Sequence, residues 1–238
     1  MSTLVLTAHG SRDPRSGANA RALADRLTLM RPDLDVRLAF LELNEPNFTD
    51  VLAELPDSRR AVVAPLLLAS AYHARLDIPK QIARAGARGI RQADVLGEDD
   101  RLVSVLRERL AELTVSPLDD HLGVMVVAIG SSNLAANART ARVAAKLASG
   151  TRWAGATTAF ATRREQSVAR AAGHLRRQGA RRLVIAPWFL APGLLTDRVS
   201  TFARDNGIPM AVPLGAHRLV AEAVLDRYEQ ALAEQQAA

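Results

Sequence analysis

The sequence predicts an α/β fold of two tandem lobes, each a four-stranded, mainly parallel sheet flanked by helices. Two observations predict it. Short runs of Val, Leu and Ile alternate with longer amphipathic segments along the 238 residues, which is typical of parallel strands joined by crossover helices. The same layout also occurs twice, and internal repetition over half a chain indicates a duplicated unit.

Two pairs of matching segments define the repeat. Residues 8–13 read AHGSRD and residues 128–133 read AIGSSN. Residues 64–69 (APLLLA) match residues 186–191 (APWFLA), each after an Arg-Arg pair and a short Val/Ile run. This register pairs three polar residues of the first half with apolar or neutral residues of the second: His9 with Ile129, Glu42 with Thr162, and His73 with Leu195.

The elements follow in the same order in each half. In the first half we expect strands near 3–8, 35–41, 60–68 and 92–96, and helices near 17–30, 47–55, 77–86 and 99–113. In the second half we expect strands near 123–129, 153–160, 182–190 and 209–213, and helices near 134–148, 164–178, 195–206 and 216–234. Between them, residues 114–121 contain a proline and acidic turn residues. We therefore place the lobes at 1–116 and 122–238.

Composition limits the possible functions. The chain contains no cysteine, which excludes disulfides, thiolate metal sites and cysteine nucleophiles, so a metal site must use His, Asp or Glu. It also contains no apolar run long enough to cross a membrane, and its start passes directly into a strand, so we expect a soluble, cytoplasmic protein without a membrane partner. The net charge of +6 suits an anionic partner or solvated helix faces. Because the basic residues lack aromatic interleaving, we expect no nucleic-acid partner.

Three residues with metal-ligand chemistry follow consecutive predicted strands of the first half. His9 comes just after the first strand, Glu42 at the end of the second, and His73 shortly after the third. In an open parallel sheet, ligands bind beyond the carboxyl ends of the strands. We therefore expect these side chains to emerge at one edge of one sheet.

Two imidazoles and one carboxylate suit Fe²⁺, Co²⁺, Ni²⁺ or Zn²⁺. Three protein ligands are the pattern of a working site, which keeps a position open, and not of a closed structural site. The alternative is that His9 satisfies a turn, His73 is a surface loop residue and Glu42 is a solvated strand end. The joint replacement of all three residues in the second half favours a shared task.

Three segments resemble the sirohydrochlorin chelatases of siroheme and cobalamin biosynthesis, the class II chelatases in their two-domain form. These are HGSRDPR at 9–15, FLELNEP at 40–46 and PLLLASAYH at 65–73. The resemblance implies two Rossmann-like lobes with a cleft between them, the second being a degenerate repeat that forms the other cleft wall. It also implies insertion of Fe²⁺ or Co²⁺ into an anionic tetrapyrrole without a nucleotide, with the metal as substrate. His9 and His73 match the metal-binding histidines of the family, and Glu42 matches its accessory carboxylate.

These three residues are therefore expected to bind the metal and to accept pyrrole protons. Histidines must be neutral for both tasks, so we expect activity to fall as pH drops through about 6.5. Arginines near the two histidine loops suit the carboxylates of the macrocycle. The expected substrate-binding residues are Ser11, Arg12, Arg15, Ser70, Tyr72 and Arg75. In the second half, residues 188–190 and 194–195 suit either an apolar wall against the ring or the core.

Two other functions compete with insertion. A metal carrier would bind the ion through the same ligands without inserting it. A histidine phosphatase also opens with a His-Gly loop, but its nucleophilic histidine normally follows an arginine, whereas Ala8 precedes His9 here. The residues leave open iron, cobalt or nickel, the siroheme or cobalamin pathway, the binding order, and a monomer or homodimer.

Overall fold

The computed structural model describes residues 2–55, 61–70, 73–86, 89–163 and 167–237, without the side chains of 73 and 235–237. The chain forms two compact units. The first consists of residues 1–97 and 216–238, and the second of residues 98–215. No helix in the described ranges is both long enough and apolar enough to cross a membrane.

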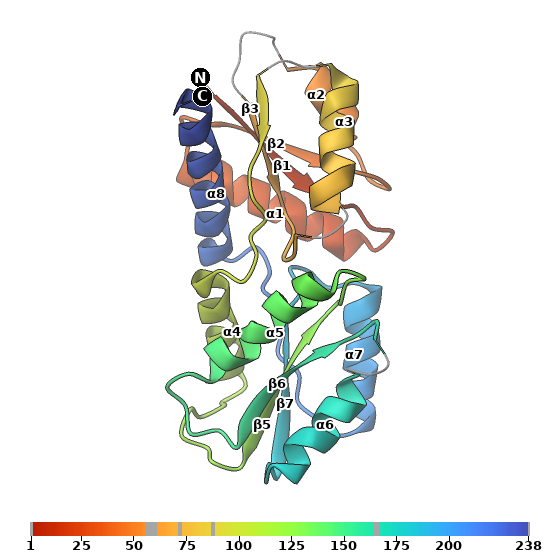
Figure 1. Cartoon of the computed structure of the whole chain (residues 1–238), viewed down its shortest axis with the longest axis vertical. Coiled ribbons are helices and arrows are strands. Elements are labelled where there is room, and N and C mark those ends of the chain that lie inside the picture. Colours follow the sequence, from red (N-terminus) through yellow and green to blue (C-terminus); the bar gives the residue numbers. More distant parts are fainter. Residues whose placement is uncertain (1, 56–60, 71–72, 87–88, 164–166, 238) are drawn as a thin grey trace. The chain divides into compact units, whose positions relative to one another are not determined.

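The first unit is built on a parallel sheet with strand order β2-β1-β3-β4 (Figure 1). β1 lies in the interior of the sheet and is buried along almost its whole length, as expected for a strand covered on both faces. The elements of this unit are β1 (Thr3–Ala8), α1 (Pro14–Met30), β2 (Asp35–Phe40), α2 (Phe48–Ala53), β3 (Ala61–Pro65), the π-helical turn η1 (His73–Asp77), α3 (Ile78–Ala85), β4 (Ile90–Gln92) and α8 (Arg218–Ala237).

Alternate residues of β1 face two different cores. Val5 packs in a cluster with Phe48, Leu52 and Ile78 from α2 and α3. Leu4 and Leu6 point to the other face and are fully buried, because successive side chains of a strand alternate in direction. Figure 1 shows α2 and α3 on one side of the sheet and α1 and α8 on the other.

The second unit has a parallel sheet with strand order β6-β5-β7. Its elements are α4 (Asp100–Glu112), β5 (Leu122–Ala128), α5 (Leu134–Ala148), β6 (Gly155–Phe160), α6 (Val168–Arg177), β7 (Arg182–Pro187) and α7 (Leu194–Asp205). Met125, Val127 and Ile185 pack in the core formed with α6 and α7. The two-lobed α/β architecture with parallel sheets is confirmed.

The second sheet has three strands where the sequence predicts four. Residues 209–213 form only an isolated bridge between Ile185 and Met210. Pro209 and Pro213 flank the bridge, and a proline has no N–H with which to extend a ladder. The fourth predicted strand of this lobe is therefore a correction to the sequence prediction.

The compact units also differ from the contiguous lobes 1–116 and 122–238. Helix α4 belongs to the second unit, and α8 at the end of the chain returns to the first. Tyr228 of α8 donates a hydrogen bond from its hydroxyl to Ser2 Oγ (2.6 Å), and its ring is buried. The last helix of each sequence repeat is thus exchanged between the units.

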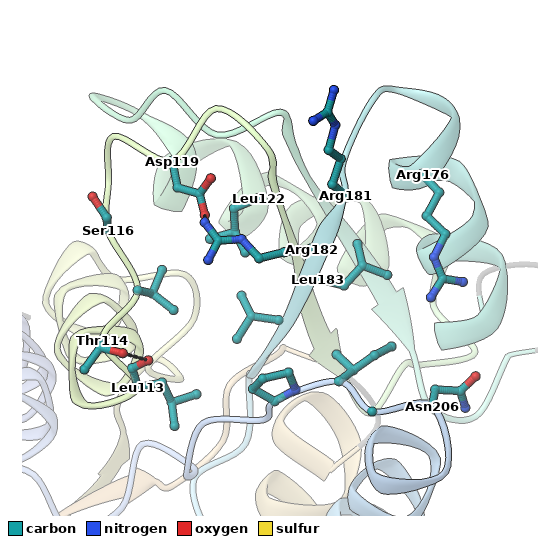
Figure 2. Close-up of a pocket in the computed structure, with 15 residues that line it drawn as sticks. Leu113, Thr114, Ser116, Asp119, Leu122, Arg176, Arg181, Arg182, Leu183 and Asn206 are labelled. Carbon is teal, nitrogen blue, oxygen red and sulfur yellow. Dashed lines mark hydrogen bonds and ion pairs between the residues drawn. The ribbon is translucent and has the colours of Figure 1, made fainter.

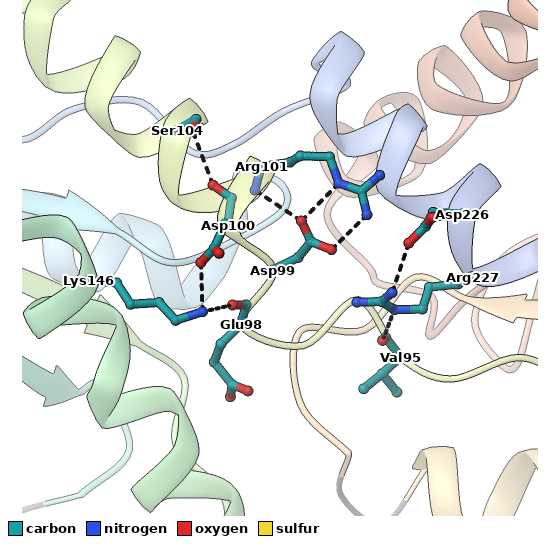
Figure 3. Close-up of polar contacts among 9 residues, drawn as sticks. All are labelled: Val95, Glu98, Asp99, Asp100, Arg101, Ser104, Lys146, Asp226 and Arg227. Carbon is teal, nitrogen blue, oxygen red and sulfur yellow. Dashed lines mark hydrogen bonds and ion pairs between the residues drawn. The ribbon is translucent and has the colours of Figure 1, made fainter. Parts of the chain in front are cut away.

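Glycines mark both points where the chain passes between units. Gly97 and Gly215 have left-handed φ values of 61° and 72°, which glycine adopts at little cost. Before Gly97, Arg227 Nε donates to the carbonyl of Val95 (3.3 Å) within the first unit. After it, Lys146 Nζ donates to the carbonyl of Glu98 (2.8 Å) and pairs with Asp100 (2.7 Å) within the second (Figure 3). Each side of the crossing is therefore fixed to its own unit.

Candidate metal centre

His9 and Glu42 meet at the carboxyl edge of the first sheet. The imidazole Nε2 of His9 lies 3.1 Å from Glu42 Oε1. The two side chains are 39% and 55% exposed, so solvent and ligands reach both. They come together because β1 and β2 are parallel neighbours with Ala8 opposite Phe40. The predicted juxtaposition of these two residues is confirmed.

The backbones of the two loops are also in contact. The N–H of Glu42 donates to the carbonyl of His9 (3.1 Å), which extends the β1·β2 pairing beyond both strands. Gly10 follows with a left-handed φ of 98°. A Cβ at Gly10 would lie 1.7 Å from the carbonyl oxygen of Glu42. Only glycine therefore allows the two loops to approach this closely.

His73 lies in the loop after β3, which pairs with the other side of β1. Its backbone begins η1, the π-helical turn that leads into α3. The side chain of His73 and the whole of Tyr72 lie outside the described residues, and within those residues no group of three His, Asp or Glu side chains is placed to hold a metal. The third ligand therefore stays a prediction, supported by the position of β3 beside β1.

The remaining predicted residues lie around this edge. Ser11 Oγ accepts the N–H of Asp13 (3.1 Å) at the start of α1. Ser70 is half-buried, and the side chains of Arg12 and Arg75 are exposed. Exposed guanidinium groups in the two histidine loops are therefore available to anions.

Arg15 forms a forked contact with Asp13, the residue that caps α1. Its Nε and Nη2 lie 3.0 and 2.5 Å from the two carboxylate oxygens, and Asp13 also accepts the N–H of Arg15 (3.0 Å). Hydrogen bonds from the Arg15 side chain, and then from its backbone, hold the pKa of Asp13 below its ordinary value. Arg15 therefore shares its charge with the helix cap, which the sequence did not reveal.

The second unit repeats this loop geometry with different side chains. The N–H of Thr162 donates to the carbonyl of Ile129 (3.1 Å), as that of Glu42 does to His9. Gly130 has a φ of 92°, close to that of Gly10. Leu195 lies in the first turn of α7. The structure thus confirms that Ile129 and Thr162 correspond to His9 and Glu42.

The predicted apolar wall divides into two groups. Trp188 and Phe189 are 2% and 5% exposed, so they are core residues of the second unit. Leu194 is 67% exposed, whereas Leu190 and Leu195 are half-buried. Among the five residues, the core alternative is therefore correct for the two aromatic ones.

A cavity of about 600 Å³ lies at the opposite, amino-terminal edge of the second sheet (Figure 2). Arg182, at the start of β7, pairs there with Asp119. Arg176 and Arg181 add positive charge to a lining of mixed polar and apolar residues. Since the strands β5 and β7 begin at this edge, the cavity is separate from the loops that correspond to the His9 loop.

A family model described as CbiX matches the chain twice, over residues 3–113 and 123–231. Together these ranges cover most of the chain. They coincide with the two sequence repeats, and not with the compact units, because each range includes the helix that is exchanged.

Individual relatives match one or both repeats. The sirohydrochlorin ferrochelatase of Priestia megaterium is 28% identical over 210 residues, which are 84% of this chain and 77% of that protein. The sirohydrochlorin cobaltochelatase of Sulfurisphaera tokodaii is 32% identical over 113 residues, which are 46% of this chain and 92% of that protein. The structure of SirB from Bacillus subtilis with Fe³⁺ matches with a TM-score of 0.80 at 22% identity, over 100% of this chain and 98% of that one. This last likeness concerns the fold.

Proposed function

The chain belongs to the CbiX family of chelatases, and on that premise we propose that it inserts Fe²⁺ or Co²⁺ into sirohydrochlorin without using a nucleotide. The observation that carries the proposal is the His9–Glu42 pair, 3.1 Å apart at the carboxyl edge of the first sheet. Relatives named as ferrochelatase and as cobaltochelatase both match this chain, so the proposal includes both metals.

The residues at this edge suit temporary binding of the metal, which is a substrate here. Imidazole and carboxylate are borderline to hard ligands that bind first-row divalent ions. His9, Glu42 and His73 would together supply three ligands and leave further positions for the ring nitrogens. Because the ligand set lacks thiolate, it binds the ion weakly enough to release it to the ring.

Insertion also requires the removal of protons. Each of two pyrrole N–H bonds breaks, its electron pair stays on nitrogen and forms a bond to the metal, and the proton leaves. A neutral imidazole nitrogen or a carboxylate oxygen released from the metal is a suitable acceptor. His9 and Glu42 thereby release the metal ion and accept protons in its place. Two protons leave the ring for each divalent ion that enters it, so the charge balances.

Sirohydrochlorin carries carboxylates on its rim, which calls for cations beside the metal. We assign this role first to Arg12 and Arg75, which are exposed. Arg15, which is paired with Asp13 at the same edge, is the third cation that we propose. The hydroxyl groups of Ser11, Ser70 and Tyr72 are the proposed neutral contacts.

The test is a mixture of free-base sirohydrochlorin, Co²⁺ or Fe²⁺, and protein under anaerobic conditions. Its visible absorption should change faster than in the mixture without protein. His9→Ala and His73→Ala should abolish this acceleration, whereas Ile129→Ala, at the position corresponding to His9, should retain it. Stoichiometric metal binding without acceleration would instead identify a metal carrier.

The same assay addresses the choice of metal. Initial rates with Fe²⁺ and Co²⁺ at equal free concentrations give the ratio of insertion rates directly. A wild-type protein that accelerates neither reaction contradicts the proposed function.

A further inference from the structure

We propose that Asn44 is a positioning residue, whose amide couples the His9 loop to the Glu42 loop and so sets the geometry of the metal-binding pair. This inference rests on the proposed function, because it concerns the same pair. Asn44 follows Glu42 by two residues and is only half-buried. It has no role among the metal-binding or proton-accepting groups described above.

The contacts of Asn44 join both loops. Its Oδ1 accepts the backbone N–H of Ser11 (2.7 Å), two residues beyond His9. Its own backbone N–H donates to the carbonyl of Glu42 (2.8 Å). One residue therefore contacts the backbone on the far side of Gly10 and the backbone of Glu42 itself.

The turn that places Asn44 is strained. Leu43, between Glu42 and Asn44, has a φ of 64° and a side chain that is 59% exposed. A left-handed conformation is unfavourable for leucine because its Cβ crowds the backbone, and the exposed side chain gains little packing in return. Strain of this kind persists where the surrounding contacts fix it, often at functional sites. The Asn44–Ser11 hydrogen bond is such a contact.

The second repeat holds its corresponding loop with an asparagine from another element. The N–H of Ser131 donates to Oδ1 of Asn137 (2.8 Å), and Asn137 Nδ2 returns a hydrogen bond to the carbonyl of Ser131 (2.8 Å). Asn137 lies in α5, inside the helix that follows the loop. The amide therefore fixes the loop to its own helix. The loop after β6 is joined to the same segment by other groups: the Thr162 hydroxyl donates to the carbonyl of Ile129 (2.7 Å), and the Arg163 side chain donates to the carbonyl of Ser131 (2.9 Å).

The first repeat has glycine where the second has this asparagine. Gly17 occupies the position in α1 that Asn137 occupies in α5, four residues after the capping residues Asp13 and Asn133. A Cβ at Gly17 would lie 3.9 Å from Nδ2 of Asn44. Position 17 therefore lies beside the Asn44 amide, at an ordinary van der Waals distance.

The backbone N–H groups of Ser11 and Ser131 occupy corresponding positions in the two repeats, and each donates to an asparagine side chain from a different element. Where the chain carries no metal ligands, the amide comes from the helix. Where it carries His9 and Glu42, the amide comes from the Glu42 loop, so a movement of either ligand loop moves the other. The relocation of the amide is what assigns a positioning role to Asn44 and not only a stabilising one.

The experiment compares Asn44→Ala with Asn137→Ala, which removes the matching hydrogen bond from the second repeat. The first readout is Co²⁺ affinity, measured by the visible absorption of the bound ion, and the second is thermal unfolding. We expect Asn44→Ala to weaken Co²⁺ binding by about 10-fold, as loss of a residue that orients a metal ligand typically does. Asn137→Ala should lower the unfolding temperature and change Co²⁺ affinity less than about 2-fold.

A third variant separates positioning from loop stability. Gly17→Asn combined with Asn44→Ala supplies the Ser11 N–H with an amide from the helix, as in the second repeat. We expect this double variant to regain the unfolding temperature while its Co²⁺ affinity stays low. It also serves as the test if Asn44→Ala alone does not fold.

Two results would overturn the inference. One is Co²⁺ affinity in Asn44→Ala equal to that of wild type, and the other is full recovery of affinity in the double variant. Both leave the proposed function intact if the wild-type protein still accelerates insertion. Conversely, a wild-type protein without insertion activity contradicts the proposed function, while the Co²⁺ comparison still decides the role of Asn44.

Discussion

The loops that follow β1 and β5 share one backbone and differ in chemistry. Both contain a left-handed glycine, at positions 10 and 130, and both extend the strand pairing by the same N–H to carbonyl contact. One carries His9 beside Glu42, and the other carries Ile129 beside Thr162. The loop conformation alone therefore does not indicate a metal site, since the second loop adopts it without metal-binding side chains.

The largest expected effect comes from giving the first loop the residues of the second. His9→Ile combined with Glu42→Thr should lower the insertion rate by about 100-fold or more, because it removes two of the three proposed ligands. The free energy of unfolding should change by less than about 1 kcal/mol, because both side chains are partly exposed and the backbone accepts the new residues. Insertion assays and denaturant unfolding measure the two effects.

The reverse exchange is the matched control. Ile129→His with Thr162→Glu should leave insertion by the first loop unchanged. A His9→Ile, Glu42→Thr variant with more than a tenth of wild-type activity would show that the chemistry does not depend on this pair.

The next largest effect distinguishes the two glycines. Gly10→Ala brings a Cβ to 1.7 Å from a backbone oxygen of Glu42, so the loops must separate. Gly130→Ala meets the Thr162 hydroxyl at 2.8 Å and the Phe160 Cβ at 3.0 Å, which are side-chain atoms and not backbone. We expect destabilisation of about 3 kcal/mol at Gly10 and about 1–2 kcal/mol at Gly130, with loss of Co²⁺ binding only at Gly10. Equal losses of stability would mean that the loops do not depend on this close approach.

A smaller effect should appear at alkaline pH in the first unit. Burial of the Tyr228 ring raises its pKa above the ordinary value. The folded state thus favours the neutral phenol, so this contribution to stability is complete below about pH 10 and is lost as pH rises through the raised pKa. Tyr228→Phe should lower stability by about 1 kcal/mol at neutral pH, through the lost hydrogen bond to Ser2, and flatten the alkaline decline.

The chain offers separate signals for this experiment. Trp153 and Trp188 both lie in the second unit, whereas both tyrosines, Tyr72 and Tyr228, lie in the first. The pH dependence of unfolding is therefore measured by circular dichroism, which follows the helices of both units, and tryptophan fluorescence, which reports the second unit alone, is the control. A wild-type protein and a Tyr228→Phe variant with the same alkaline profile would contradict the role of this phenol.

The smallest effect concerns the helix caps at acidic pH. Asp13 caps α1 and titrates, whereas Asn133 caps α5 and does not. Since Arg15 lowers the pKa of Asp13, its contribution is present above the ordinary carboxyl pKa of about 3.9 and is lost as pH falls through the lowered value. Asp13→Asn should reduce the acid dependence of unfolding, measured by circular dichroism. An unchanged acid profile would show that the cap contributes little.

The pairing of the His9 and Glu42 loops was predictable from the sequence, because it follows from the repeat alignment and from the parallel arrangement of neighbouring strands. His9 and Glu42 each follow a strand, and neighbouring parallel strands bring their carboxyl ends to one edge. The role of Arg15 as a partner of Asp13 was missed because an arginine near a ligand loop suits a substrate anion equally well. The signal was present in the aspartate that precedes Pro14, which marks the start of a helix.

The exchange of α4 and α8 was not predictable from the pattern. Each helix ends its own sequence repeat and has an apolar face that suits either sheet. Which sheet it covers depends on packing between segments far apart in the chain, and hydrophobic periodicity carries no information on the partner. The absence of a fourth strand from the second sheet could have been predicted from the sequence, since Pro209 and Pro213 disfavour a β-ladder there.

The return of α8 to the first unit has a mechanical consequence. Both ends of the chain belong to that unit, and Ser2 near one end is hydrogen-bonded to Tyr228 near the other. The second unit is in effect an insertion between Gly97 and Ala216. Tension applied to the two ends therefore loads the first unit, and reaches the second only after α8 has been pulled away.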